Sequence, residues 1–218
     1  MSVVTIRGQC GSGPAEVGRQ IAERLHVDYV DREIIAEVAA RLHRQEQEVV
    51  AKEMPPGSLL GRIVEALERI GGAGYEGAYL PLWQMPLDDA RYFEALKSVI
   101  RELARSESLV ILGRGSQFIL KDHPGTLHVL LVAPIEVRVK RVMQDLKLKE
   151  EAAKQEIASF DKSSREFIKR YFQAEWEDPV NYNLVVNTGH LGYQTAASIV
   201  FNALSYKNEA KDGQATID

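Results

Sequence analysis

Short apolar stretches alternate with segments of helical periodicity along most of this 218-residue chain. The segments "SLVILGRG" at residues 108–115 and "TLHVLLVAP" at residues 126–134 are apolar until a glycine or a proline ends them, which is typical of strands buried on both faces. Further strands are predicted at residues 2–6, near Tyr29 and at residues 182–188. Because strands that alternate with helices form a parallel sheet covered on both faces, the sequence predicts a three-layer α/β/α fold with a five-stranded parallel sheet.

The segments between these strands carry apolar residues every three or four positions, as amphipathic helices do. Helices are predicted at residues 15–25, 32–42, 88–108, 135–146, 149–176 and 192–204. In the helix at residues 135–146, the valines are expected to face the core, whereas Arg138 and Arg141 are expected to face solvent.

The composition favours one domain. With 45% apolar residues the chain can bury one substantial core, so residues 1–206 are predicted to form a single domain. Residues 45–87 lack a clear period and are predicted to be an inserted lobe, and the polar residues 207–218 are predicted to be a flexible tail.

The charge and the cysteine count exclude several classes of protein. A formal net charge of −4 provides no global basic field, which argues against a nucleic-acid-binding protein. A single cysteine, Cys10, and five scattered histidines without ligand spacing predict no metal site. No apolar run approaches the roughly 18 residues of a membrane-spanning helix. The chain is therefore expected to be cytoplasmic and not to bind membranes, and any phosphate site must be a local cluster.

The first predicted strand runs into the stretch "RGQCGSGPAEVG" at residues 7–18. Gly8 and Gly13 have the spacing of the phosphate-binding motif G-x-x-x-x-G-K-[ST], but Pro14 and Ala15 stand where that motif has its lysine and its hydroxyl. The lysine normally contacts the outer phosphates and the hydroxyl is a magnesium ligand. A phosphate site here therefore needs a cation from elsewhere in the chain.

The loop itself can still bind an anion through its main chain. Glycines allow N–H groups to turn toward a phosphate, and the N-terminus of the following helix adds its dipole. Cofactor contacts are therefore predicted at Gly8, Gly11, Ser12 and Gly13. The alternative is a glycine turn that binds nothing, as occurs before helices in many folds.

Several arginines and lysines could supply the missing charge. Arg138 and Arg141 lie one helical turn apart, so both can point toward one anion. A second set lies in the helix at residues 149–176 and comprises Lys162, Arg165, Lys169 and Arg170. Guanidinium groups suit phosphate because they donate two parallel hydrogen bonds. The alternative for the second set is a solvated helix face.

Charged residues also follow the second and third predicted strands. Ligands of parallel α/β sheets bind at the carboxyl ends of the strands, which makes Asp31, Arg32 and Arg114 candidate substrate-binding residues. Arg114 stands between two glycines directly after a buried strand. The alternatives are that Asp31 caps the next helix and that Arg114 pairs with Asp31 across the edge of the sheet.

Two further features have both a functional and a structural interpretation. Cys10 would be redox-sensitive if positive neighbours lowered its pKa, and is otherwise a small inert residue. The lobe at residues 45–87 contains the apolar side chains Tyr75, Tyr79, Leu80 and Trp83. These side chains either cover the core or form a surface for a partner or a second copy in a homo-oligomer.

The sequence resembles the cytidylate kinase-like family of P-loop nucleoside monophosphate kinases over about residues 2–204. The stretches that carry the resemblance are "GSG" at residues 11–13, "YVDREII", "VILGRGSQFIL" and "FDKSSREFIKRYFQAEWEDPVNYNLVVNT". The resemblance implies a P-loop kinase fold in which residues 45–87 bind the nucleoside monophosphate (NMP) and residues 145–178 form a helical lid. It also implies transfer of the γ-phosphoryl group of ATP, with Mg²⁺, to CMP or dCMP.

The resemblance further implies roles for individual residues. The loop at Gly11 to Gly13 would hold the ATP phosphates, and Arg114 would face the monophosphate or the cytosine. In the lid, Asp161 and Arg165 would be catalytic, with Arg170 and Arg141 neutralising the transferred group.

The sequence departs from the family pattern at two positions. Pro14 replaces the loop lysine, and Gly115 stands where an aspartate usually follows the arginine. These departures define a second hypothesis, which is a nucleotide-binding or nucleotide-sensing module with a degenerate loop that does not turn over its ligand.

Overall fold

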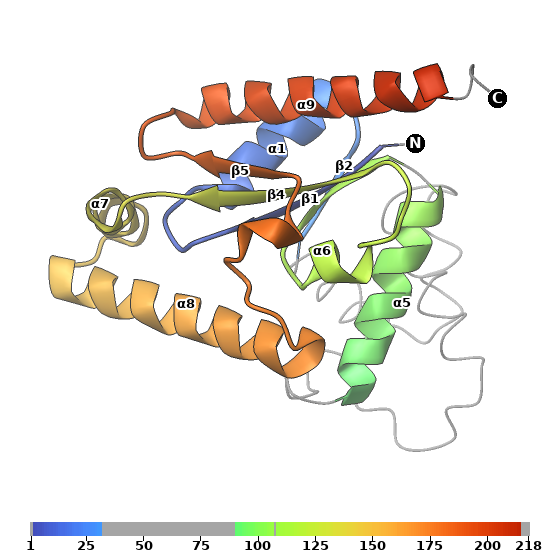
Figure 1. Ribbon diagram of the computed structural model, residues 1–218. Coiled ribbons are helices and arrows are strands. Elements are labelled where there is room, and N and C mark those ends of the chain that lie inside the picture. The colour runs from blue at the N-terminus through green and yellow to red at the C-terminus, as the bar shows by residue number, and fades with distance from the viewer. Residues whose placement is uncertain (1, 32–89, 107, 215–218) are drawn as a thin grey trace, which may run out of the picture. The chain divides into compact units, whose positions relative to one another are not determined.

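A computed structural model describes residues 2–31, 90–106 and 108–214 of the chain (Figure 1). The chain divides into two compact units, one made of residues 1–29 and 110–218 and the other of residues 30–109. The predicted helix at residues 32–42 and the predicted lobe at residues 45–87 lie outside the described residues.

The described elements follow the predicted alternation of strands and helices. In chain order they are β1 (Val3–Gly8), α1 (Pro14–Leu25), β2 (Asp28–Val30), α5 (Ala90–Ser106), β3 (Leu109–Leu112), α6 (Ser116–Ile119), β4 (Thr126–Val132), α7 (Ile135–Leu146), α8 (Glu150–Phe172), the 3₁₀ helix η1 (Pro179–Asn181), β5 (Leu184–Asn187) and α9 (Tyr193–Gln214). The short α6 was not predicted, because its four residues are too few to show a period.

The sheet has five strands in the order β2-β3-β1-β4-β5. Strand β1 pairs in parallel with β4, and β4 pairs in parallel with β5. In this register Gly8 lies beside Leu131, and Val132 lies beside Asn187. The loops after β1, β4 and β5 therefore leave the sheet at the same edge, where parallel α/β sheets bind their ligands. The predicted five-stranded parallel sheet is confirmed.

Helices α1 and α9 cover one face of the sheet (Figure 1). The core on this side is one cluster of buried apolar side chains, to which β1 contributes Val4 and Ile6, α1 contributes Val17 and Ile21, and α9 contributes Val200. Alternate residues of a strand point to opposite faces, so Thr5 and Arg7 of β1 point to the other side of the sheet.

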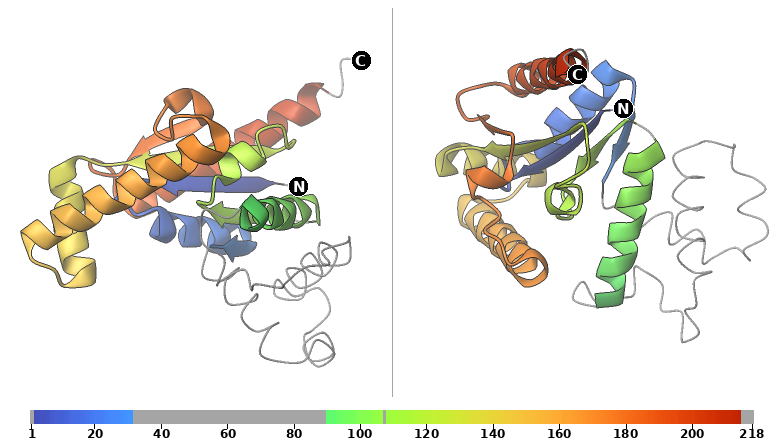
Figure 2. Two further views of the ribbon diagram at one scale, coloured as in Figure 1. Left: turned by 90° about the horizontal axis from the view of Figure 1, so that it is seen from below. Right: turned by 45° about the vertical axis from the view of Figure 1, so that its right-hand side comes forward.

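On that other side, α8 crosses below the strands, as Figures 1 and 2 show. Ile168 of α8 packs with Leu130 of β4 and with Trp176 and Tyr182 from the segment after the helix. Nearer the N-terminus of α8, Ile157 packs against Val139 of α7, together with other apolar residues of the two helices. The three-layer arrangement therefore places α8 next to the loop that follows β1.

The C-terminal helix is longer than the sequence predicted. Helix α9 ends at Gln214, so much of the segment predicted to be a flexible tail, residues 207–218, is helical. Lys207 anchors this part of the helix, because its Nζ donates to the main-chain oxygen of Thr126 at 2.5 Å. None of the described helices, including α9, has the length and apolar character needed to cross a membrane.

Candidate phosphate-binding site

The glycine loop, residues 8–13, connects β1 to the N-terminus of α1 as a tight turn. The N–H of Gln9 donates to the main-chain oxygen of Leu131, which continues the pairing of β1 with β4. The N–H and the hydroxyl of Ser12 both donate to the main-chain oxygen of Gln9, at 2.9 and 2.7 Å. Gly11 and Gly13 have φ angles of 80° and 81°, a backbone conformation that glycine adopts without strain.

The loop retains main-chain donors for an anion. Among the described residues, the N–H groups of Gly11 and Gly13 have no hydrogen-bond acceptor. The first turn of α1 begins at Gly13 without a side-chain cap, so the N–H groups of Ala15 and Glu16 add positive partial charge at the same place. The side chain and N–H of Ser12, in contrast, are used within the loop.

Pro14 removes two groups from the loop at once. It lacks the ammonium group of the usual lysine, and it also lacks an N–H. A proline at the first position of a helix stabilises the helix start because its φ angle is already helical. The substitution therefore favours the folded loop and weakens its capacity to bind phosphate.

Arg141 and Thr188 fasten the loop to the end of β5. The guanidinium of Arg141 donates to the main-chain oxygen of Gly11 at 3.2 Å and to the hydroxyl and the main-chain oxygen of Thr188 at 3.0 and 2.7 Å. The Thr188 hydroxyl in turn donates to the main-chain oxygen of Ser12 at 2.7 Å. Arg141 therefore lies at the loop, and its hydrogen bonds go to protein oxygens in this structure.

Arg138 is buried rather than facing solvent. It is 8% exposed, and its Nη1 pairs with Oδ2 of Asp161 at 2.6 Å. The other carboxylate oxygen, Oδ1, accepts from the main-chain N–H of Cys10 at 3.1 Å. The expectation of solvent exposure was wrong because the charge of Arg138 is compensated by an acidic residue of another helix. The structure thus brings together two predicted site residues and the loop.

The predicted cationic stripe of α8 lies on an exposed face and pairs with glutamates. The pairs are Lys162 with Glu166 at 3.8 Å, Arg165 with Glu177 at 3.6 Å, and Lys169 with Glu175 at 2.8 Å. Exposed ion pairs of this kind contribute little to stability, so the cations can exchange partners at small cost. Arg170 is also exposed, and its guanidinium lies 5.8 Å from the ring of Tyr171.

Arg114 has a restricted backbone conformation at the end of β3. Its φ angle is 58°, and the flanking Gly113 and Gly115 also have positive φ angles. This left-handed region is less favourable for a residue with a Cβ than for glycine, and His26, Lys147 and Gln173 also adopt it, at helix ends. Asp31, another predicted substrate contact, is half-buried directly after β2, and Arg32 lies outside the described residues.

Cys10 does not have the environment of a reactive thiol. Burial, with smaller contributions from Asp161 and Glu156, raises the pKa of its thiol to about 11. The thiolate is the nucleophile, so the thiol is inert at neutral pH. This result supports the interpretation of Cys10 as a small packing residue.

Sequence reasoning missed three residues that shape the loop. Gln9 bridges two segments, because its Nε2 donates to Glu177 at 2.7 Å and its Oε1 accepts from the N–H of Ala133 at 3.1 Å. The ring of Tyr193 packs directly on Gly13. Arg7, the residue before Gly8, lies near the rings of Phe160 and Trp176. Of the three, Arg7 alone gave a signal in the sequence, namely a charge at the end of an apolar strand.

The described residues do not form a ready-made magnesium site. They contain no group of three or more histidine, cysteine, aspartate or glutamate side chains that could hold a metal ion. Ala15 has no hydroxyl to act as a ligand, and Asp161 is occupied by Cys10 and Arg138. Mg²⁺ commonly binds through one or two carboxylates together with substrate phosphates, which is the arrangement these residues leave possible.

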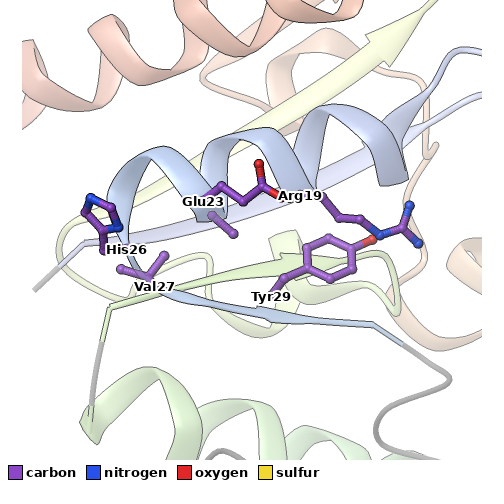
Figure 3. Close-up of a pocket in the computed structure, with 6 residues that line it drawn as sticks. Arg19, Glu23, His26, Val27 and Tyr29 are labelled. Atoms are coloured by element: carbon purple, nitrogen blue, oxygen red, sulfur yellow. The ribbon is translucent and has the colours of Figure 1, made fainter.

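A surface pocket lies beside α1, away from the loop (Figure 3). It has a volume of about 510 Å³ and is lined by Arg19, Ala22, Glu23, His26, Val27 and Tyr29. These residues belong to α1 from Arg19 onward and to the segment after it, whereas the loop precedes the helix. A helix of 12 residues is about 18 Å long, so this pocket is separate from the phosphate loop.

A glycine loop between the first strand and helix of a parallel sheet, with cationic helices at the same edge, defines a P-loop kinase-type α/β fold. The chain belongs to the cytidylate kinase-like family, which it matches over residues 3–190. The resemblance noted in the sequence is therefore confirmed.

Relatives differ in how much of their length they share with the chain. A cytidylate kinase of Sulfolobus acidocaldarius is 24% identical over 205 residues, covering 94% of this chain and 95% of that protein. A uronate isomerase of Corynebacterium glutamicum is 35% identical over 104 residues, which are 48% of this chain and 20% of the isomerase. The chain thus spans about a fifth of the length of the isomerase.

Solved structures share the fold at low sequence identity. An uncharacterized protein from Eubacterium ventriosum gives a TM-score of 0.69 at 19% identity, covering 94% of this chain and 99% of that one. A gluconokinase from Sinorhizobium meliloti gives a TM-score of 0.52 at 16% identity, with coverage of 98% and 97%. These likenesses concern the fold alone.

Proposed function

We propose that this protein is a nucleoside monophosphate kinase that transfers the γ-phosphoryl group of ATP to CMP or dCMP. The observation that carries the proposal is the pair of unused main-chain donors at Gly11 and Gly13, next to the N-terminus of α1. Such a group of donors binds phosphate without any particular side chain. Membership of the cytidylate kinase-like family supports the choice of nucleotide as the phosphate donor and acceptor.

The acceptor side of the proposal rests on the end of β3. Arg114 lies between two glycines directly after β3, at the carboxyl edge of the sheet, where it can bind the phosphate of the monophosphate. Asp31 and Arg32 are proposed to contact the same substrate, and residues 45–87 to provide the rest of the acceptor site. The preference for cytosine comes from the resemblance to cytidylate kinases and is the finer part of the proposal.

Phosphoryl transfer requires alignment of the two substrates and neutralisation of charge rather than covalent catalysis. Arg165 and Arg170 are proposed to supply positive charge to the transferred group from the exposed face of α8. Arg138, Arg141 and Asp161 are proposed to fix the loop against α7 and α8. Mg²⁺ would accompany ATP, bound mainly by its phosphates.

A second candidate function is a binding module that holds a nucleotide without consuming it. The specific observation in its favour is Pro14, which removes from the loop both a charge and an N–H donor. In such a module, ATP or a monophosphate would bind and alter the structure, with no diphosphate formed.

The experiment that separates the two functions is a coupled ADP-release assay with ATP, Mg²⁺ and a panel of CMP, dCMP, UMP, AMP and GMP. Turnover with CMP or dCMP above the other acceptors is the expected result. If folded protein turns over none of the five while calorimetry detects nucleotide binding, the binding module is correct. If it neither turns over nor binds any nucleotide, both functions are wrong.

A further inference from the structure

Arg7 at the end of β1 has no acidic or hydrogen-bonded partner among the described residues. The rings of Phe160 and Trp176 lie 5.8 and 5.3 Å from the centre of its guanidinium group. Its Nε is buried and has no hydrogen-bond acceptor. Burial lowers the pKa of Arg7, and Tyr182 and Asp161 act in the opposite direction. A partly buried guanidinium normally has a carboxylate or carbonyl partner, because desolvation of an unpaired charge is costly.

Trp176, which packs beside Arg7, also has a buried donor without an acceptor. The indole Nε1 of Trp176 is buried without an acceptor, and so is the Nε of Arg138. These N–H groups can only donate. Asp161 is an acidic residue whose charge acts on Arg7, and its two oxygens are used by Cys10 and Arg138. Buried donors without acceptors are expected where a site receives an anion.

Arg7 adjoins the two halves of the proposed active site. It directly precedes Gly8, the first glycine of the phosphate loop. On its other side, its Nη1 lies 3.2 Å from the position that a Cβ would have at Gly113, the first residue of the turn that carries Arg114. The backbone of Arg7 therefore adjoins the loop proposed for ATP, and its guanidinium lies beside the turn proposed for the acceptor.

We propose that Arg7 supplies the cation that the loop lacks at Pro14, and that it binds the phosphate groups lying between the glycine loop and the Arg114 turn. This inference rests on the proposed function for the identity of the ligand, but the anion site itself does not depend on turnover. A guanidinium can replace the ammonium of a loop lysine, because it stays charged when buried and donates two parallel hydrogen bonds to phosphate.

The alternative is a structural role, in which Arg7 braces Phe160 and Trp176 by contact with their rings. The two roles make opposite predictions for Arg7→Met, which keeps an apolar stem and removes the charge. A phosphate-binding Arg7 is costly to bury in the free protein, so the variant should melt no lower than the wild type and lose affinity for phosphate. A bracing Arg7 should give a lower melting temperature and unchanged affinity.

The test is calorimetric titration with inorganic tripolyphosphate and with ATP, on the wild type, Arg7→Met, Arg7→Gln and Arg7→Lys. The control variant is Arg24→Met, because Arg24 also lies over an aromatic ring, that of Phe201 at 4.3 Å, on the opposite face of the sheet. Both neutral variants should bind tripolyphosphate about 10- to 100-fold more weakly, as expected for the loss of a charge-assisted hydrogen bond. Arg7→Lys should recover part of this loss, and Arg24→Met should bind as the wild type does.

Two results would overturn the inference: wild-type affinity in a folded Arg7→Met or Arg7→Gln variant, or no binding of tripolyphosphate by the wild type. Arg7→Gln keeps a polar side chain, so the comparison remains available if the methionine variant does not fold. Failure of the proposed function gives a different pattern, in which tripolyphosphate binds through Arg7 and no monophosphate is phosphorylated. Conversely, wild-type kinase activity in Arg7→Met would refute the phosphate-binding role of Arg7 and would be consistent with the proposed function.

Discussion

The carboxylate of Asp161 accepts a hydrogen bond from the main-chain N–H of Cys10 at 3.1 Å, and its second oxygen accepts from Arg138 at 2.6 Å. An acidic side chain of α8 therefore occupies a donor of the phosphate loop. The same contact ties α8 and α7 to the loop. Asp161 is thus expected to affect stability and phosphate binding in opposite directions.

Asp161→Asn should destabilise the protein and strengthen ATP binding. Removing the partner of the nearly buried Arg138 should cost about 3 kcal/mol of unfolding free energy, measured by urea denaturation. Removal of a negative charge beside the loop should lower the dissociation constant for ATP about fivefold. Glu166→Gln, which neutralises an exposed carboxylate of α8, is the control and should change neither quantity. Weaker ATP binding by Asp161→Asn would mean that the carboxylate assists the nucleotide rather than competing with it.

Arg141→Met should loosen the attachment of the loop to β5. The variant loses the bonds to Gly11 and to both oxygens of Thr188, so its unfolding free energy should fall by about 1–3 kcal/mol. The matched variant is Lys140→Met, which removes a charge from the neighbouring exposed position of α7. Equal stability of the two variants would show that the Arg141 bonds do not hold the loop.

Gly13→Ala should be strongly destabilising. A Cβ at this position would lie 2.2 Å from Cε1 of Tyr193, and the φ angle of 81° is unfavourable for alanine. A loss of at least about 2 kcal/mol is expected in chemical denaturation. Gly192→Ala is the control, because a Cβ there meets nothing within 4 Å. If the clash with the ring is the main cause, the additional change Tyr193→Ala should restore part of the stability.

The sequence predicted the fold better than it predicted the site. Strand and helix periods are local, so the five strands and the helices that cover them followed from patterns such as "VILG" and "HVLLV". The glycine loop was also predictable, since its spacing is a short-range signal. The burial of Arg138 was not, because Asp161 is 23 residues away and belongs to another helix.

Arg7 shows a further limit of reading the sequence. The predicted strand at residues 2–6 ends one residue before Arg7, whereas β1 extends to Gly8. Strand alternation then sets Arg7 on the face opposite to Val4 and Ile6. The sequence did not show that the ring of Trp176, which is 169 positions later in the chain, would pack beside the Arg7 guanidinium. The indole ring provides no hydrogen-bond acceptor for the buried Nε of Arg7. Long-range contacts of this kind decide which of many charged residues lacks a partner.

His128 should make the protein less stable in mild acid. The residue is 7% exposed, its Nδ1 lies 2.7 Å from the hydroxyl of Thr5, and burial, with a smaller contribution from Lys207, lowers its pKa from 6.5 to about 4. The unfolded chain therefore binds a proton that the folded chain rejects between these two pH values. Stability should be constant above about pH 6.5 and should fall by about 2 kcal/mol by pH 5.

Urea unfolding at pH 7.5 and pH 5 measures this effect. His128→Gln should remove most of the difference between the two conditions, because the side chain no longer titrates. His190→Gln, at an exposed position, should keep the difference of the wild type. An unchanged pH dependence in His128→Gln would assign the acid sensitivity to other groups.

Pro14→Lys should strengthen nucleotide binding by restoring an ammonium group and an N–H to the first turn of α1. Pro14→Met is the matched control, because it restores the N–H without the charge. The lysine variant should bind ATP about tenfold more tightly than the methionine variant, as expected for one charge-assisted contact, and should turn over CMP faster.

Both variants should be slightly less stable than the wild type, because proline favours the start of the helix. Equal ATP affinity of the two variants would mean that an ammonium at this position does not reach the phosphates.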